Sequence, residues 1–370
     1  MKIKTFAFFG SVTLFAALTT RAQTSAPTTQ GQITTFDAPG AGPIGTMPQS
    51  INPAGTITGY YWDAKGANHG FLRTSDGTIT TFDAPGAATT TTNSGTQAES
   101  INPAGEITGT FEDVSHMYYG FLRAKDGTIT AFSVPSTDTL PFATFALSIN
   151  AAGEITGYYV INPGIQVSPV THGFFRTRDG TITTFDVPGT KLQYTISNSI
   201  NPSGEITGSY AASGAGYGFL REKDGTINTF DIPGVGPNGT RTLPQSINPS
   251  GEITGSYFGT NFRVLHGFVR AKDGTITTFD APGVGPNGSE TLPQSINPAG
   301  EITGYFFLAP EGSAFPVIHG FLRATDGTIT TFDAPGAVLD TRALSINPAG
   351  AITGWYTDAS GVNHGFLRQP

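Results

Sequence analysis

One motif recurs seven times along this 370-residue chain, and this repetition limits the possible folds more than any other feature. In its most regular copy the motif covers residues 294–304, 319–323 and 326–336. An Asn that follows Ser-Ile marks each copy, and its positions are Asn52, Asn102, Asn150, Asn201, Asn248, Asn297 and Asn347. Spacings of 47 to 51 residues separate these positions, which is a typical length for one unit of a repeat protein.

Four short segments of each repeat have the composition of β-strands. In the most regular copy they are residues 294–297, 301–306, 319–323 and 328–333, which are rich in Ile, Thr, Tyr and Phe. The sequences Asn-Pro-Ala-Gly and Lys-Asp-Gly, which lie between these segments in several copies, are typical of tight turns. No segment after residue 22 keeps a helical period. We therefore predict an all-β chain built from four-stranded antiparallel units.

Both faces of each predicted sheet carry apolar side chains. Phe321 and Leu322 are neighbours in one strand and therefore point to opposite faces. Ile329 and Phe332 are three residues apart and also point in opposite directions. A sheet with one face in water would alternate instead, so each sheet must be covered on both faces. Four-stranded sheets that stack face to face around an axis meet this requirement, which predicts a seven-bladed β-propeller.

The two ends of the repeat region complement each other. The chain begins with a fourth strand, residues 31–40, and ends with a third strand, residues 364–368. Together they supply the strands that complete one four-stranded unit, which removes open sheet edges. We predict that the last blade is closed by both termini.

Residues 1–22 have the features of an export signal. Lys2 and Lys4 precede an apolar run over residues 5–18, and small residues precede a cleavage site after Ala22. The alternative, an uncleaved N-terminal anchor, would need about 20 apolar residues to span a membrane, and no later stretch is apolar enough to span one either. We predict a signal peptide over residues 1–22 and a single propeller domain over residues 23–370. The location would be secreted, periplasmic or at the cell surface.

Charge and cysteine content exclude several partners. Cleavage would remove Lys2, Lys4 and Arg21, so 16 basic residues would remain against 27 acidic ones, a net charge of −11. A surface this acidic does not fit the phosphates of nucleic acid or an anionic membrane. The chain has no Cys, which excludes disulfides and thiolate metal sites. We expect a monomer stabilised by packing alone.

The loops divide into two groups that lie on opposite faces of the predicted propeller. The first-to-second and third-to-fourth loops are short and nearly invariant, whereas residues 60–68, 158–171 and 284–293 belong to loops that vary in length. Binding sites are usually built from variable loops on a rigid scaffold. Aromatic residues on the variable face would suit sugar rings, and the candidates are Trp62, Tyr118, Phe258, Phe262, Phe315 and Trp355. The alternative is that these residues pack between blades.

A Ser, a His and an Asp recur in the repeats and together suggest a hydrolase triad. They are Ser50, Ser100, Ser148, Ser199, Ser246, Ser295 and Ser345; His69, His172, His266, His319 and His364; and Asp37, Asp83, Asp186, Asp231, Asp280 and Asp333. An active site occurs once, whereas this set occurs in each repeat, and Tyr119 and Tyr217 replace His in two copies. We therefore predict a structural hydrogen-bond network without catalytic residues. The Arg that ends each third strand is expected to pair with the Asp on the neighbouring strand.

Signals for metals and cofactors are weak. Glu112, Asp113 and His116 form the one cluster of possible ligands outside the repeat pattern. The recurring His residues lie about 50 positions apart, which is not the spacing of paired metal ligands. Neither a phosphate-binding glycine loop nor a nucleophile elbow occurs. We expect no metal and no cofactor.

The elements Ser-Ile-Asn-x-x-Gly-x-Ile-Thr-Gly and His-Gly-Phe-Leu-Arg resemble the bacterial extracellular repeats of the HAF family. The resemblance extends over residues 31–368, and it departs from the family in the Gly between His and Phe and in a longer period. It implies an exported, propeller-like bacterial protein. It supplies no activity and no catalytic residues.

These observations favour an exported binding or scaffold module, whose ligand would be a glycan, a cell-wall polymer or a partner protein on the variable-loop face. One alternative is a polysaccharide lyase or glycosidase that uses a pair of acids at the mouth of the central channel. The acids outside the repeat pattern are Glu99, Asp113, Asp138, Glu290, Glu311 and Asp340. A second alternative is a purely structural surface protein.

Overall fold

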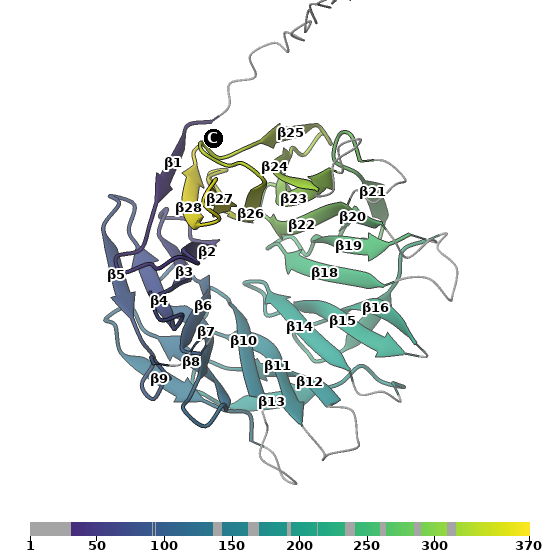
Figure 1. Ribbon diagram of the computed structural model, residues 1–370. Helices are drawn as coiled ribbons and strands as arrows, with labels where there is room; N and C mark the ends of the chain where they lie inside the picture. The colour runs from purple at the N-terminus through teal and green to yellow at the C-terminus, as the bar shows by residue number, and fades with distance from the viewer. Residues whose placement is uncertain are drawn as a thin grey trace, which may run out of the picture. The chain divides into compact units, whose positions relative to one another are not determined.

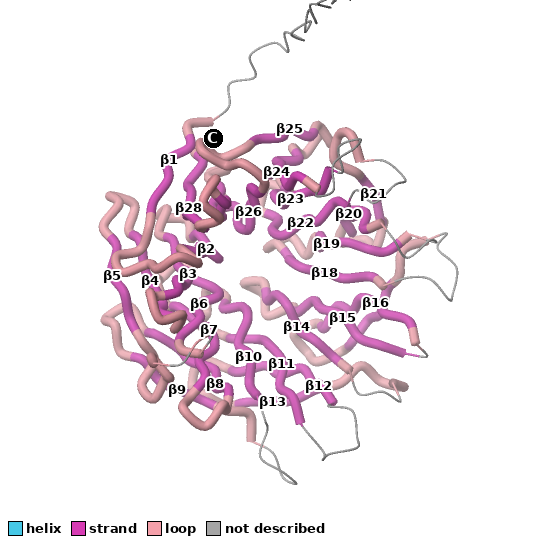
Figure 2. Tube along the Cα trace, viewed as in Figure 1, coloured by secondary structure: helices cyan, strands magenta, loops and turns pink. Residues whose placement is uncertain are grey.

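All regular elements in the described part of the chain are β-strands, as Figure 2 shows. The computed structural model describes residues 31–90, 92, 94–135, 143–161, 170–190, 194–212, 214–233, 241–259, 264–284, 290–308 and 316–370. The predicted signal peptide, residues 1–22, lies outside the described residues. Within them, no helix has the length and apolar character to cross a membrane.

Each repeat contributes four strands, which Figure 1 labels in chain order. The first strands are β2 (Thr46–Ile51), β6 (Thr96–Ile101), β10 (Ala143–Ile149), β14 (Thr195–Ile200), β18 (Thr242–Ile247), β22 (Glu290–Ile296) and β26 (Asp340–Ile346). The second strands are β3 (Ile57–Trp62), β7 (Ile107–Glu112), β11 (Ile155–Ile161), β15 (Ile206–Ala212), β19 (Ile253–Phe258), β23 (Ile302–Leu308) and β27 (Ile352–Thr357). The third strands are β4 (Asn68–Arg73), β8 (Tyr118–Arg123), β12 (Val170–Arg176), β16 (Ala215–Arg221), β20 (Leu265–Arg270), β24 (Val317–Arg323) and β28 (Asn363–Arg368). The fourth strands are β5 (Ile79–Phe82), β9 (Ile129–Phe132), β13 (Ile182–Phe185), β17 (Ile227–Phe230), β21 (Ile276–Phe279), β25 (Ile329–Phe332) and β1 (Ile33–Phe36).

Consecutive strands of a repeat pair antiparallel, which confirms the predicted four-stranded units. Single-residue parallel bridges join β8 to β10 and β24 to β26, so two pairs of these units are continuous. The first strand is longer than the sequence predicts. In the first repeat it begins at Thr46 and includes Pro48. A register shift between Pro48 and Ser50 interrupts the pairing of β2 with β3, and the same shift occurs where alanine replaces the proline, as between Ala98 and Ser100. The N-terminal strand β1 pairs antiparallel with β28, and Ile33 lies opposite Arg368.

The two ends of the antiparallel strands form two opposite sides of the fold, and in the names that follow each of these sides is called an edge. First strands begin, second strands end and third strands begin at one edge, which we call the variable edge. The repeated Asn-Pro-x-Gly and Asp-Gly turns lie at the other edge, which we call the turn edge. In Asn52–Gly55 the glycine adopts a φ of 76°, which closes the turn without the strain a side chain would add. The two opposite edges of the fold thus differ in how much the sequence can vary.

Apolar side chains cover both faces of the sheets, as the sequence predicts. Phe321 is fully buried in a cluster with Ile302 and Phe306 of its own repeat. Its neighbour Leu322 packs instead against a cluster of the next repeat that includes Ile352. Each apolar cluster therefore joins consecutive repeats, and burial of each large side chain stabilises the fold by about 1.5–3 kcal/mol.

Buried asparagines connect the repeats at the turn edge. Asn52 Oδ1 accepts hydrogen bonds from the N–H groups of Ala54 and Thr56, both at 3.0 Å, and so holds its own turn. Asn52 Nδ2 donates to the carbonyl oxygen of Asn102 in the next repeat. The same bond, at 3.0–3.3 Å, follows in every repeat, and Asn347 returns it to Asn52. We call this series the asparagine circuit.

A second series of hydrogen bonds runs beside the asparagine circuit in the opposite direction. The N–H of Ile101 donates to Ser50 Oγ of the preceding repeat at 3.3 Å. Equivalent bonds of 3.2–3.4 Å occur in all repeats, and the N–H of Ile51 donates to Ser345. The repeated Ser is therefore an acceptor for backbone, which supports the structural function that the sequence predicts for it.

We expect Asn248→Ala to lower the free energy of unfolding by roughly 2–4 kcal/mol, because it leaves buried backbone groups of two repeats without partners. Denaturation by urea measures this loss. Asn228→Ala, at an exposed position of β17, is the control and should change stability by less than about 0.5 kcal/mol. Equal effects of the two substitutions would contradict a stabilising function of the circuit.

Candidate functional site

Partly exposed aromatic side chains gather in the half of the sheets nearer the variable edge. They are Tyr60, Trp62, Tyr118, Phe145, Tyr158, Phe258, Tyr305, Phe307 and Trp355, which we call the aromatic belt. Side chains alternate along a strand, so the intervening rings are directed elsewhere. Tyr61, Tyr159 and Tyr356 are buried and stack on the His of the adjacent third strand. The same strand thus supplies one ring to the core and the next ring to a partly exposed surface.

Four of the six aromatic residues predicted to bind lie in the described part of the chain, and all four belong to the belt. Trp62 contacts Tyr60 edge to face, with ring centroids 5.1 Å apart. Tyr118 contacts Phe145 of the next repeat at 5.4 Å. Phe258 ends β19 and is half-buried. The other two, Phe262 and Phe315, lie outside the described residues.

Trp355, the fourth predicted residue, belongs to a cluster with a charged group. The guanidinium carbon of Arg342 lies 4.7 Å from the ring centroid of Trp355 and 5.2 Å from that of Tyr305. Arg342 Nε donates to both carboxylate oxygens of Asp340 at 3.0 Å. Burial raises the pKa of the Asp340 carboxyl, whereas Arg342 opposes the rise. Arg342 therefore covers one face of Trp355 and is held in place by Asp340.

Glu99 is an acid with a strongly shifted carboxyl pKa. It lies in β6 between repeats that carry Tyr60 and Tyr158, and burial raises the pKa of its carboxyl to about 7. Burial raises the pKa of Tyr60 and Tyr158 as well, and the charge of Glu99 adds to both shifts. The other repeats place neutral residues at this position, which are Gln49, Leu147, Asn198, Gln245, Gln294 and Leu344. Glu99 is thus a carboxyl group that can exchange a proton near neutral pH.

The remaining acids outside the repeat pattern do not form a described pair with Glu99. Burial raises the pKa of Glu290, which lies near Tyr305 in the Arg342 cluster. Asp113 Oδ1 accepts the N–H groups of Ser115 and Met117, so it holds a turn. Asp138 and Glu311 lie outside the described residues.

The structure corrects one predicted pairing. The repeated Asp binds the His of the adjacent strand rather than the Arg, and His Nδ1 lies 2.8–2.9 Å from the carboxylate in five repeats. The Arg lies instead over the Phe of the preceding repeat's fourth strand, at 4.8–5.1 Å from the ring centroid. The reason is position, because the Arg lies at the turn edge, whereas the Asp follows the end of its strand near the His. Within the described residues no hydrogen bond joins a repeated Ser to a repeated His, so the three residues form no triad.

Glu112 and His116 do contact each other, since His116 Nδ1 lies 2.6 Å from Glu112 Oε1. His116 has a positive φ of 61°, and its N–H donates to the carbonyl oxygen of Asp113 at 3.1 Å. The described residues contain no group of three His, Asp or Glu side chains arranged to hold a metal ion.

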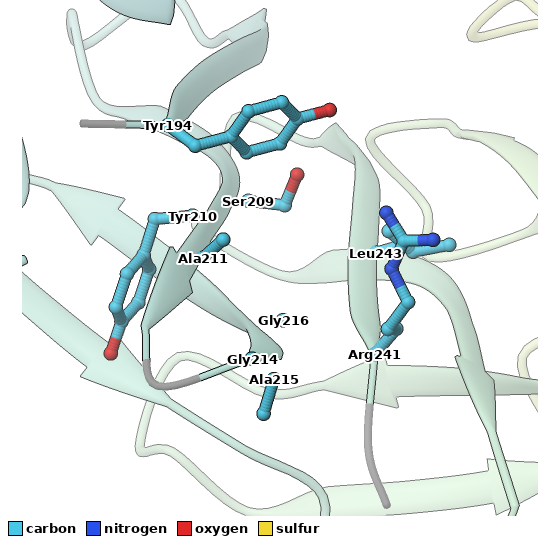
Figure 3. A pocket seen from close by; sticks show the side chains of 9 residues that line it. All are labelled: Tyr194, Ser209, Tyr210, Ala211, Gly214, Ala215, Gly216, Arg241 and Leu243. Carbon is cyan, nitrogen blue, oxygen red and sulfur yellow. The ribbon is translucent and has the colours of Figure 1, made fainter. Parts of the chain in front are cut away.

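A pocket that the sequence does not suggest lies at the variable edge of the fourth repeat, and we call it the Arg241 pocket (Figure 3). It has a volume of about 230 Å³. Its lining consists of Tyr194, Ser209, Tyr210, Ala211, Gly214, Ala215, Gly216, Arg241 and Leu243. Small side chains make most of this lining, whereas the sequence-based search selected large aromatic ones. In the sequence, the pocket is therefore indicated by small residues in the fourth repeat at positions where other repeats have larger ones.

Comparisons with known proteins bear on the fold alone. No protein-family model and no curated protein sequence matches this chain. A solved structure of streptogramin B lyase is 16% identical, with a TM-score of 0.54 over 92% of this chain and 98% of that one. A catalytically inactive virginiamycin B lyase from Staphylococcus aureus with quinupristin is 17% identical, with a TM-score of 0.55 over 92% and 99%. A puromycin hydrolase variant is 12% identical, with a TM-score of 0.57 over 84% of this chain and 50% of that one. The chain is therefore an all-β, propeller-like repeat protein.

We expect Glu99→Gln to stabilise the protein at pH 8 by about 1–3 kcal/mol and to have little effect at pH 4. The folded state raises the pKa of this acid above its unfolded value, so the native protein loses stability as pH rises from about 4.5 to 7. Denaturation curves of both proteins at the two pH values measure the difference. Gln245→Leu, at the same position of the fifth repeat, introduces no titrating group and should shift stability equally at both pH values.

Proposed function

We propose that this chain is a secreted seven-bladed β-propeller that binds a glycan or cell-wall polymer at its variable edge. Seven repeats of four strands support the blade number, and the last blade would consist of β26, β27, β28 and β1. The return of the asparagine circuit from Asn347 to Asn52 supports a closed arrangement. Residues 1–22 would be the export signal, and the repeats would be a diverged form of the HAF type.

The observation that carries the binding function is the aromatic belt. Flat aromatic rings suit the apolar faces of sugar rings, and these rings are partly exposed on one edge of the fold. Four of them carry a phenolic hydroxyl and Trp355 carries an indole N–H, groups that donate hydrogen bonds beside the flat surface, whereas the indole N–H of Trp62 is buried. A partner protein is the alternative ligand for the same surface.

An enzyme that acts on polysaccharides is the second candidate, and Glu99 favours it. A carboxyl with a pKa of about 7 matches the requirement for a general acid or base at neutral pH. A lyase would need one such base, whereas a glycosidase would need a second carboxylate about 5–10 Å away. Depolymerisation of a bound polysaccharide that Glu99→Gln abolishes would support this candidate over simple binding.

Closure by the chain termini predicts that loss of β1 destabilises the whole domain. We expect a chain that starts at Ala38 to melt at least about 5 °C lower than one that starts at Gly31, because β28 loses one of its two partner strands and His364 loses Asp37. Thermal unfolding and gel filtration measure stability and aggregation. Equal melting temperatures of the two chains would refute closure by β1.

Binding at the aromatic belt predicts that its Trp residues determine retention on a polymer. In pull-downs with insoluble peptidoglycan and plant cell-wall polysaccharides, we expect Trp62→Ala and Trp355→Ala each to weaken binding by about fivefold to thirtyfold. Val338→Ala removes an exposed non-aromatic side chain near the same edge and should leave binding unchanged. Binding that survives both Trp substitutions would exclude the belt as the binding surface.

A further inference from the structure

The Arg241 pocket exists because the fourth repeat lacks side chains that other repeats place there. Ala211 occupies the position of Trp62 in the first repeat, and Ser209 occupies the position of Tyr60. Gly216 takes the place of Asn68 on the third strand. The β15–β16 hairpin is short, since Ala212 pairs directly with Ala215. The volume of about 230 Å³ is thus space that aromatic side chains fill elsewhere in the same fold.

Two side chains at equivalent positions of consecutive repeats define the sides of the pocket. Tyr194 and Arg241 each lie one residue before a first strand, and they pair with Thr171 and Gly216 through isolated parallel bridges. Figure 3 shows both side chains beside the opening, with the hydroxyl of Ser209 between them in this view. Ser209 is 8% exposed, so its hydroxyl lies at the inner end of the pocket rather than on the outer surface. The pocket therefore offers one ring, one hydroxyl and one cation.

Arg241 is the one charged residue in the pocket lining, and its charge has a different environment from those of the other described arginines. Seven of those arginines lie over Phe rings. Arg178 pairs with Glu106 at 2.9 Å, and Arg342 pairs with Asp340 at 3.0 Å. For Arg241, no carboxylate of the described residues lies within ion-pair distance, and the side chain is exposed to solvent. An uncompensated guanidinium in a pocket of an acidic protein favours an anionic ligand.

We propose that the Arg241 pocket binds the carboxylate-bearing ring of an acidic sugar, a uronic acid residue. This proposal rests on the glycan-binding function proposed above and names the class of sugar. Arg241 would bind the carboxylate through two parallel N–H bonds, which matches the planar shape of both groups. Tyr194 would contact the face of the sugar ring, and Ser209 would bond to a ring hydroxyl.

Size and charge both favour a single uronic acid ring over other anions. Pockets for drug-sized ligands usually measure about 300–1,000 Å³, so the Arg241 pocket matches one ring rather than a larger molecule. A phosphate group would carry nearly two negative charges, whereas the lining offers a single positive one. One guanidinium balances one carboxylate.

The test is isothermal titration of the full domain with glucuronate, glucose, acetate and inorganic phosphate. Glucuronate and glucose share a ring and differ in the carboxylate, so we expect glucuronate to bind at least about tenfold more tightly than glucose. Acetate and phosphate lack the ring and should bind at least about tenfold more weakly than glucuronate. Equal binding of glucose would refute the carboxylate assignment, and equal binding of acetate or phosphate would refute the sugar assignment.

Three variants locate the binding. Arg241→Gln should remove the preference for glucuronate, because it removes the charge from an exposed side chain without disturbing the core. Ala211→Phe places in the pocket the residue that the fifth and sixth repeats carry at this position, and it should abolish binding. Arg178→Gln, at the turn edge, is the matched control and should bind as the native protein does. Binding of glucuronate that persists in Arg241→Gln would overturn the proposal.

The pull-down with polymers separates this proposal from the proposed function. If polymers bind the native protein and Arg241→Gln equally, whereas free glucuronate does not bind, the uronic acid assignment fails and the binding module stands. If no polymer binds but glucuronate binds in an Arg241-dependent way, the pocket stands and the polymer-binding function fails.

Discussion

The amide side chain of the asparagine that recurs in each repeat stabilises both the turn within a repeat and the contact between consecutive repeats. Its oxygen accepts two backbone N–H groups and fixes the turn between the first and second strands. Its nitrogen donates to the carbonyl of the same residue one repeat further on. Because one side chain does both, the local turn and the contact between sheets form or fail together. This coupling is important in a chain without cysteines, where no disulfide joins the repeats.

The sequence is therefore nearly constant at the turn edge and differs between repeats at the variable edge. At the turn edge, the asparagine circuit requires Asn in every repeat, and the contact between Arg and Phe requires both of these residues in every repeat. At the variable edge, backbone bridges such as Asn68 to Gly95 and Gly216 to Arg241 join consecutive repeats. Backbone groups make these bridges and do not require one particular side chain, so single repeats can lose or gain bulk there. Trp355 under Arg342 and the small side chains around Arg241 are two results of that freedom. Function is expected where the repeats differ, and the differences concentrate at this edge.

The sequence predicts the regular part of the fold and little of the candidate site. Phe321 and Leu322 predict coverage of both faces because strand periodicity alone determines where adjacent side chains point. The predicted partner of Asp83, the repeated Arg, is wrong. The third strand carries both His69 and an Arg, and only the strand register shows that the His lies beside the Asp. The Arg241 pocket could not be predicted from candidate residues. It arises because Ala211 and Gly216 are smaller than the residues at these positions in the first repeat. Only the three-dimensional packing shows that the unfilled volume forms a pocket.

The pairing of β1 with β28 imposes an order on how the molecule can be made. The first described strand of the chain bonds to the last, and the carboxylate of Asp37 lies against His364 across 327 residues of sequence. A chain that is synthesised from its N-terminus therefore holds β1 without this partner until residues 363–368 have been made. Long-range contacts of this kind slow folding, since distant segments must meet before any energy is gained. The sheet that contains β1 cannot be completed before β28 is available, so a chain that stops ahead of residue 363 leaves β1 without its partner.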